Sequence, residues 1–188
     1  MTYISLTKAE HSVVDAISAT KHEMLSIVKD WSSINSGSYN HSGLKDMRER
    51  LSDSFSSLPG EISELTLEEG QQIDQKGNIE TVNYESALKI SVRPKAPIQL
   101  VLTGHYDTVF PVDSHFQNYE TIGDGILKGP GVADMKGGIV VMKTALQFFE
   151  TMPISKNIGY NILLSPDEEI GSLGSASILE DLGRASHA

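Results

Sequence analysis

The spacing of apolar residues in the first third of the chain predicts amphipathic helices. Apolar side chains recur at three- and four-residue steps from Thr7 to Trp31, and again from about Gly43 to Leu58. Thr7 and Glu10 have the spacing of a capping box at the start of the first helix. A Pro-Gly pair would end the second helix, and a loop rich in Ser, Asn and Gly separates the two helices.

After residue 60 the pattern changes to alternation and short apolar runs, which predict strands. Strands are expected near Ile62–Leu67, at Ala87–Val92, at Ile98–Gly104 and at Ile158–Ser165, with a hairpin-like connection over Gly70–Tyr84 and an irregular acidic loop over Pro111–Gly125. The apolar run at Ile98–Gly104 is predicted to be the most buried strand. A helix from about Met135 to Met152 joins the last two strands, and a short helix is expected at Gly174–Leu182. Strand, helix and strand form a βαβ unit, so the pattern predicts an α/β fold with a helix-covered sheet.

Composition narrows the class of protein. The chain has 188 residues, of which 39% are hydrophobic and 21% charged, and this suits one domain with a sizeable core. Its formal net charge of −10 argues against nucleic acid and anionic membrane as partners. Because the chain has no cysteine, any metal must be held by histidine and carboxylates. No apolar run is long enough to span a membrane or to resemble a signal sequence, so a cytoplasmic location is expected.

The first candidate chemistry follows the strand at Ile98–Gly104. His105 and Asp107 stand two positions apart at its carboxyl end, where open α/β sheets place ligands. Imidazole is a common metal ligand, and a ligating histidine usually donates its other N–H to a carboxylate. One interpretation is therefore a ligand histidine with its orienting aspartate. The alternative is an ordinary turn, with His105 exposed and Asp107 capping the loop.

Two further acidic clusters occupy comparable places. Asp134 lies in a glycine-rich turn that leads into a helix, and Glu168 and Glu169 directly follow the strand that ends at Ser165. In a right-handed βαβ unit all three clusters can converge on one edge of the sheet. Imidazole and carboxylate groups without thiol suit a zinc site, in which one of two adjacent glutamates binds metal and the other accepts a proton from water.

Each cluster also has a simpler interpretation. An Asp-Glu-Glu sequence after a strand is often only a solvated loop. The turn GPGVAD resembles a dinucleotide-binding glycine turn, but Asp134 stands where the third glycine should be. The sequence GSLGS suggests a nucleophile elbow but lacks its G-x-S-x-G order.

Taken together, GHYDTVF, GPGVADMKGG and SPDEEIGSLGS resemble the three successive motifs of the di-zinc exopeptidases and amidohydrolases of metallopeptidase family 20. This family includes glutamate carboxypeptidases, acetylornithine deacetylases and succinyl-diaminopimelate desuccinylases. The resemblance extends from Gln99 to Ser175, and INSGSYNHSGL is similar, more weakly, to the family's helix-joining loop. It implies a mixed, mostly parallel sheet with helices on both faces. GPGVADMKGG is most similar to glutamate carboxypeptidase-like members.

The resemblance also implies a role for each matched residue. His105 would bind one zinc ion, Asp107 would orient His105, and Asp134 would bridge two zinc ions. Glu168 would be the general base, and Glu169 would bind the second zinc ion. The peptide bond between Asp134 and the following Met would be cis.

The chain departs from the family pattern after these motifs. Two more ligands, an acidic residue and a late histidine, lie further along in the family, and the sequence ends at Ala188 before either. His187 does not match the late histidine motif. The expectation is that residues 1–188 form the N-terminal part of a catalytic domain, without the inserted dimerisation or lid domain and the C-terminal part. A homodimer is then expected only for the full-length form, and this chain alone is expected to be nearly inactive.

The favoured hypothesis is a zinc-dependent hydrolase of peptide or N-acyl amide bonds, glutamate carboxypeptidase-like, with small peptides or N-acyl amino acids as substrates. One alternative is a deacetylase or desuccinylase of the same family. Another is a truncated, non-catalytic module with residual metal binding. A third is a nucleotide-binding domain, based on the glycine turn alone.

Overall fold

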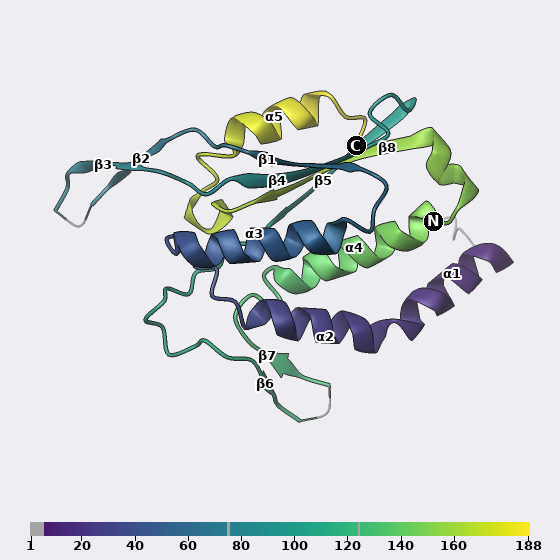
Figure 1. Ribbon diagram of the computed structural model, residues 1–188, viewed down its shortest axis with the longest axis horizontal. Coiled ribbons are helices and arrows are strands. Elements are labelled where there is room, and N and C mark those ends of the chain that lie inside the picture. The colour runs from purple at the N-terminus through teal and green to yellow at the C-terminus, as the bar shows by residue number, and fades with distance from the viewer. Residues whose placement is uncertain (1–5, 75, 124) are drawn as a thin grey trace, which may run out of the picture.

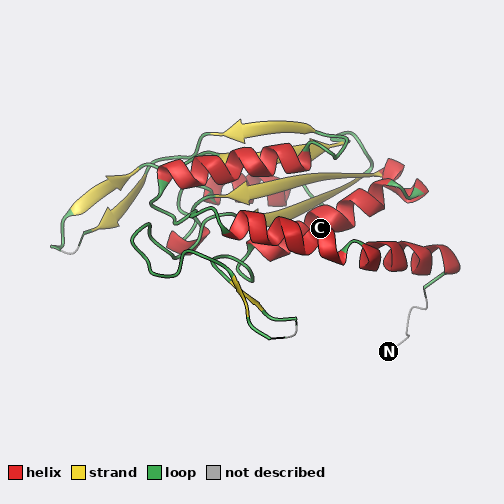
Figure 2. Ribbon diagram, turned by 60° about the horizontal axis from the view of Figure 1, so that its bottom comes forward, coloured by secondary structure: helices red, strands yellow, loops and turns green. Residues whose placement is uncertain are grey.

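A four-stranded mixed sheet with the strand order β1-β4-β8-β5 forms the centre of the molecule (Figure 1). The structure is a computed structural model that describes residues 6–74, 76–123 and 125–188. The strands are β1 (Glu61–Leu65), β4 (Ala87–Val92), β8 (Ile158–Ser165) and β5 (Ile98–His105). Helices cover both faces of the sheet, as predicted for an α/β fold (Figure 2).

The sheet contains fewer parallel pairs than predicted. β5 and β8 pair in parallel, whereas β1 with β4 and β4 with β8 are antiparallel. Among the described strands of this sheet, the crossover from β5 through α4 (Lys136–Glu150) to β8 makes the one parallel pair. The predicted mixed, helix-flanked sheet is therefore confirmed, and the predicted predominance of parallel strands is wrong.

Alternating side chains divide the core between the two faces of the sheet. Leu88, Ile90 and Val92 of β4 pack into the larger cluster, which α2 (Lys21–Ser32), α3 (His41–Phe55) and α4 complete. This cluster contains the largest fully buried side chains, among them Trp31, Tyr106, Tyr160, Phe55, Leu44 and Met47. On the other face a smaller cluster lies under α5 (Ala176–Arg184), which Figure 1 shows above the sheet.

β5 lies at the edge of the sheet, not at its centre. Most of its residues are half-buried, whereas β8 lies between two strands and is buried along most of its length. Residues near the C-terminus cover part of the outer edge of β5: the Val101 N–H donates to the Ala188 carbonyl at 2.8 Å, and the His187 N–H donates to the Gln99 carbonyl at 2.8 Å. The prediction that Ile98–Gly104 is the most buried strand is wrong.

The first predicted helix is interrupted. α1 (Lys8–Ala19) and α2 meet at Thr20, whose backbone is not helical in ψ and whose hydroxyl donates to the Ile17 carbonyl at 2.7 Å. A threonine hydroxyl can compete for a backbone carbonyl in this way, and it ends the helix without changing the apolar pattern. The capping box of Thr7 and Glu10 is confirmed.

Two small hairpins extend from the main body (Figure 2). β2 (Gly70–Ile73) and β3 (Ile79–Val82) form the predicted hairpin-like connection. β6 (Glu120–Thr121) and β7 (Leu127–Lys128) form a second hairpin partly within the loop predicted to be irregular. Two short 3₁₀ helices, η1 (Pro153–Asn157) and η2 (Glu168–Ile170), flank β8. Among the described residues, no helix is both long and apolar enough to span a membrane.

We expect Glu150→Gln to lower the free energy of unfolding at pH 7 by about 2 kcal/mol, because it weakens a half-buried ion pair. Arg93 donates to Glu150 at 2.7 Å, and the Tyr160 hydroxyl donates to the same carboxylate at 2.9 Å. The hydrogen bond from Arg93 holds the pKa of Glu150 below its usual range, with Tyr160 adding to the effect. This stabilisation is present above the unfolded pKa of about 4.3 and is lost as the pH falls through the lower folded pKa.

Urea unfolding at pH 7 and at about pH 3.5 measures the effect. The difference between wild type and Glu150→Gln should shrink at the lower pH. Glu49→Gln is the control, because Glu49 is exposed and pairs with the exposed Lys45 at 4.0 Å. Equal stability of the Glu150 variant and wild type at pH 7 would contradict the prediction.

Candidate metal centre

The centre lies where two parallel strands end side by side. His105 is the last residue of β5 and stands in register with Ser165, the last residue of β8. The chain that leaves β8 therefore passes His105 and carries Glu168 and Glu169 in the 3₁₀ turn η2. Asp134 comes from the turn that precedes α4, the helix between the two strands. A βαβ unit thus brings three segments to one edge of the sheet.

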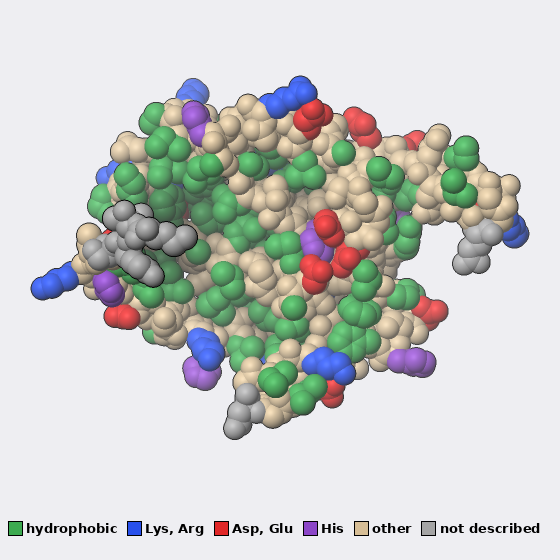
Figure 3. All heavy atoms as spheres, turned by 180° about the vertical axis from the view of Figure 1, so that it is seen from behind, with side chains coloured by type: hydrophobic (Ala, Val, Ile, Leu, Met, Phe, Trp, Pro, Cys, Tyr) green, Lys and Arg blue, Asp and Glu red, His purple; other side chains and the backbone are tan. Residues whose placement is uncertain are grey.

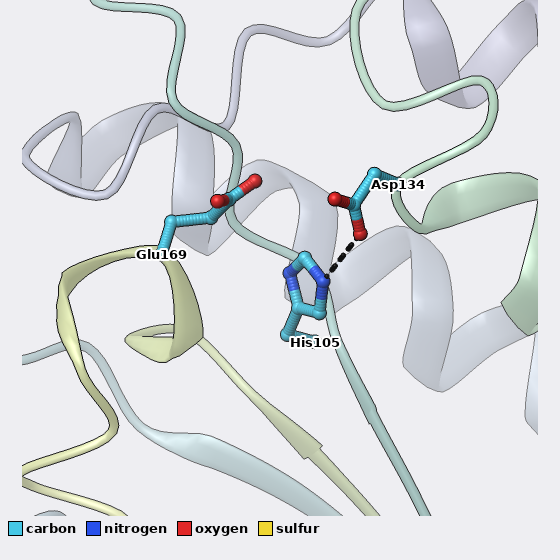
Figure 4. Close-up of side chains that lie close together, drawn as sticks. All are labelled: His105, Asp134 and Glu169. Carbon is cyan, nitrogen blue, oxygen red and sulfur yellow. Dashed lines mark hydrogen bonds and ion pairs between the residues drawn. The ribbon is translucent and has the colours of Figure 1, made fainter.

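His105, Asp134 and Glu169 form a cluster that could hold a metal ion. Their nearest nitrogen and oxygen atoms all lie within 4.8 Å of one another, and Figure 4 shows the three side chains directed toward a shared space. His105 Nε2 lies 3.0 Å from Asp134 Oδ1. One imidazole and two carboxylates suit a divalent ion such as zinc, so this donor set fits the metal that the sequence motifs imply.

The cluster is closed on one side and open on the other. The His105 side chain is buried, whereas 75% of the Asp134 side chain is exposed. The space-filling view in Figure 3 shows a histidine with acidic side chains gathered around it on an accessible face. A ligand can therefore approach from the side of Asp134 while His105 is held from behind.

Asp107 is fully buried and connects His105 to the glutamate turn. Its Oδ1 lies 3.2 Å from His105 Nδ1. The backbone N–H groups of Glu168 and Glu169 donate to its carboxylate at 3.3 and 3.1 Å, and the Ser38 hydroxyl donates at 2.8 Å. One carboxylate therefore orients the imidazole and also fixes the backbone that carries both glutamates. The hydrogen bonds from the backbones of Glu168 and Glu169 to Asp107 were not part of the sequence-based hypothesis.

The charges in the cluster favour a cation. Burial disfavours the imidazolium form, but the hydrogen bond and charge of Asp107, the hydrogen bond of Asp134 and the charge of Glu168 outweigh it and raise the pKa of His105 to about 9. Partial burial raises the pKa of Glu169, and the neighbouring carboxylates add to this effect against the opposing influence of His105. Several acidic groups thus compete for one imidazole, and a divalent ion would compensate their charge.

Glu168 lies beside the cluster of His105, Asp134 and Glu169 and is not part of it. Its side chain is 54% exposed, and its Oε2 is 3.8 Å from His105 Nε2. It lines a cavity of about 190 Å³ with His105, Met135 and Ser172. A carboxylate in this position is free to exchange protons with a water molecule or a substrate.

The turn that carries Asp134 is anchored by a buried lysine. The Lys136 ammonium donates to the Trp31 carbonyl at 3.0 Å and to the Ile34 carbonyl at 2.7 Å. Burial lowers the pKa of Lys136 to about 7. Gly131 has φ of +68°, and a Cβ there would meet the Lys136 side chain at 2.9 Å. The Asp134–Met135 peptide bond is cis, so that prediction is confirmed.

Sequence reasoning missed three residues that support the centre: Ser38, Lys136 and Asp167. Asp167 is fully buried, and its carboxylate accepts the N–H groups of Gly174 and Ser175 at 2.8 and 3.0 Å, which holds the loop after η2. Small residues that follow Asp167 at a turn were the available signal for this role. Ser38 lies in the helix-joining loop noted in the sequence.

His187 pairs with β5 and is not in the described ligand cluster.

Comparison with known proteins agrees with the fold and the motifs. Residues 101–188 match the family model described as Peptidase family M20/M25/M40. No curated protein sequence matches the chain. Human carnosine dipeptidase 1 and the di-peptidase Dug1p from Saccharomyces cerevisiae are structurally similar, each with a TM-score of 0.70 and 19% sequence identity over 91% of this chain. The M20 family metallo-carboxypeptidase Sso-CP2 from Sulfolobus solfataricus has a TM-score of 0.62 and 18% identity over 88% of this chain.

These similarities cover only part of each relative. The chain spans 37% of the carnosine dipeptidase and Dug1p chains, and 36% of the Sso-CP2 chain. At such low identity the structural likeness concerns the fold.

Proposed function

Because residues 101–188 match the model of the M20/M25/M40 peptidase family, we propose that this chain forms part of a zinc-dependent hydrolase of peptide or N-acyl amide bonds. The observation that carries the proposal is the convergence of His105, Asp134 and Glu169 within 4.8 Å, with Glu168 beside them. Two of the similar structures are dipeptidases and one is a carboxypeptidase, so short peptides are the proposed substrates. GPGVADMKGG resembles the corresponding motif of glutamate carboxypeptidase-like members, and N-acyl amino acids are the second proposed substrate class.

In the proposed site, each residue has one task. His105, Asp134 and Glu169 would hold the metal. When bound, zinc supplies Lewis-acid polarisation of the scissile carbonyl and lowers the pKa of water. Glu168 accepts a proton from the attacking water and passes it to the leaving amine. Asp107 keeps the His105 imidazole in the orientation that presents Nε2 to the ligand space, as its contact with Nδ1 favours.

The described residues supply three candidate ligand side chains for two proposed ions, fewer than the three per ion that a catalytic zinc usually has. We therefore expect a purified chain of these residues to bind zinc weakly and to hydrolyse peptides slowly at best. A non-catalytic module with residual metal binding remains the competing hypothesis, and turnover distinguishes the two.

The direct test is metal-dependent hydrolysis. Removing metal with a chelator should abolish hydrolysis of a panel of dipeptides and N-acetyl amino acids, and adding zinc should restore it. Metal content is measured in parallel by elemental analysis. Hydrolysis that persists in the chelated protein would contradict the proposed function, and zinc binding without any turnover in a longer form that includes the remaining ligands would favour the non-catalytic hypothesis.

A further inference from the structure

A cavity of about 360 Å³ is lined in part by Glu169 and shares no lining residue with the cavity that Glu168 lines. Three segments form its walls: residues 37–40, residues 108–112 and the turn at 169–170. The lining is mainly apolar, with side chains from Tyr39, Val109, Pro111, Val112 and Ile170. Among the described residues that line it, none is Lys or Arg, and Glu169 is the charged one.

The walls of this cavity are held together by hydrogen bonds. The Asn35 side-chain amide donates to the Phe110 carbonyl at 3.1 Å and to Gln117 Oε1 at 2.8 Å, and its oxygen accepts the Gly37 N–H at 3.1 Å. Residue 37 also forms a β-bridge with Thr108. A Cβ at Gly37 would lie 2.4 Å from the Phe110 carbonyl oxygen, so only glycine permits this approach. The two loops are thus fastened to each other, and the cavity is largely preformed.

Large apolar side chains remain open at its rim. Tyr39 is 60% exposed, Val109 is 60% exposed and Val112 is 66% exposed. Single exposed apolar residues are ordinary, but these three surround one cavity that adjoins a candidate metal ligand. An apolar group in the cavity would remove their surfaces from water, which is the main source of favourable binding energy in such sites.

We propose that this cavity receives a side chain of the substrate and selects an uncharged, apolar one, such as that of leucine or phenylalanine. The inference rests on the proposed function, since it places the cavity next to the bond that is cleaved. An acidic side chain would lose its hydration without gaining a Lys or Arg partner among the described residues that line the cavity. The selectivity therefore runs against aspartate and glutamate side chains, despite the motif-level similarity to glutamate carboxypeptidase-like members.

The test measures binding without catalysis. The ¹⁵N-labelled protein is titrated, in the presence of chelator, with N-acetyl-L-leucinamide and with the α-amide of N-acetyl-L-glutamic acid. These probes differ in the side chain alone. We expect the leucine probe to shift the amide signals of residues 37–40 and 108–112 saturably, and the glutamate probe to need at least about tenfold higher concentration.

Two matched variants connect the preference to this cavity. Val112→Arg places a cation at the rim and should remove most of the preference, because the glutamate probe should bind about tenfold better than in wild type. Val141→Arg is the control, because Val141 is 57% exposed on α4 and does not line the cavity. It should leave both titrations unchanged.

Several results would overturn the proposal: equal affinity for the two probes, tighter binding of the glutamate probe to wild type, shifts confined to other parts of the chain, or no shift with either probe. If the proposed function is wrong, the protein will instead fail to bind zinc or to hydrolyse peptides with zinc. Because the probe titration is done without metal, its result does not depend on the result of the zinc and hydrolysis assays.

Discussion

Replacing Glu168 with glutamine should lower kcat for peptide hydrolysis by about 10²–10⁴-fold, the usual contribution of a positioned general base or acid. Glutamine keeps the size of the side chain but cannot accept a proton. Because the Glu168 side chain is 54% exposed and lies outside the group of His105, Asp134 and Glu169, the variant should keep both its fold and its metal content. The value of kcat is measured with whichever form of the protein, these 188 residues or a longer one, hydrolyses the peptide panel. Zinc content and thermal unfolding are measured on the same form.

Glu180→Gln is the matched control, since Glu180 is exposed on α5 and pairs with Arg184 in the same helix. It should not change kcat. If the Glu168 variant has wild-type kcat and normal zinc content, Glu168 is not the general base. Loss of zinc in that variant would instead identify Glu168 as a ligand.

Asp107→Asn should have the largest effect on the integrity of the centre. The wild-type carboxylate faces four donors, from His105, Ser38 and the backbones of Glu168 and Glu169. An amide replaces one acceptor oxygen with an NH₂ group, so at least one buried donor then faces another donor. We expect a loss of about 2–4 kcal/mol in the free energy of unfolding, and zinc affinity lower by about 10–100-fold.

The same variant should change how stability depends on pH in metal-free protein. The folded pKa of His105 is about 9, above the value of 6.5 for an unperturbed histidine. The protonated imidazole therefore stabilises the fold fully below about pH 6.5, and this contribution disappears as the pH rises through 9. Because Asp107 contributes the strongest attraction that opposes burial, Asp107→Asn should flatten this decline.

Chemical denaturation between pH 6 and 9.5, with chelator present, measures the pH dependence, and zinc titration calorimetry measures affinity. Asp113→Asn is the control, since Asp113 is exposed in the loop that follows. A decline with pH that is equal in wild type and Asp107→Asn would show that Asp107 does not control the ionisation of His105.

Much of the candidate centre follows from local sequence. The His-x-Asp spacing lets Asp107 approach the ring of His105 from the same short segment, and this contact needs no distant residue. Adjacent Glu168 and Glu169 must differ in direction, so one can point into the ligand space while the other lies beside it. The capping box of Thr7 and Glu10 depends on neighbouring residues, and the alternating side chains of Ala87–Val92 are visible in the sequence, which is why both features could be predicted.

The position of β5 within the sheet could not be predicted from the sequence. Its apolar run is compatible with a central strand or with an edge strand, because periodicity reports how apolar a segment is and not which strands lie beside it. β8 occupies the central position through pairing with β4 on one side and β5 on the other. The antiparallel pairs likewise depend on partners far apart in the chain.

The sequence by itself determined which residues can bind metal or exchange protons, since side-chain chemistry and short spacings are properties of the chain. Tertiary structure alone decided that Ser38 and two backbone amides meet on Asp107, that Lys136 anchors the turn of Asp134, and that an apolar cavity opens beside Glu169. These contacts join residues tens of positions apart, and their geometry depends on how the loops after β5 and β8 pack against the loop between α2 and α3. Spacing along a chain carries no information about such packing, whereas burial and hydrogen bonding in the folded state fix it.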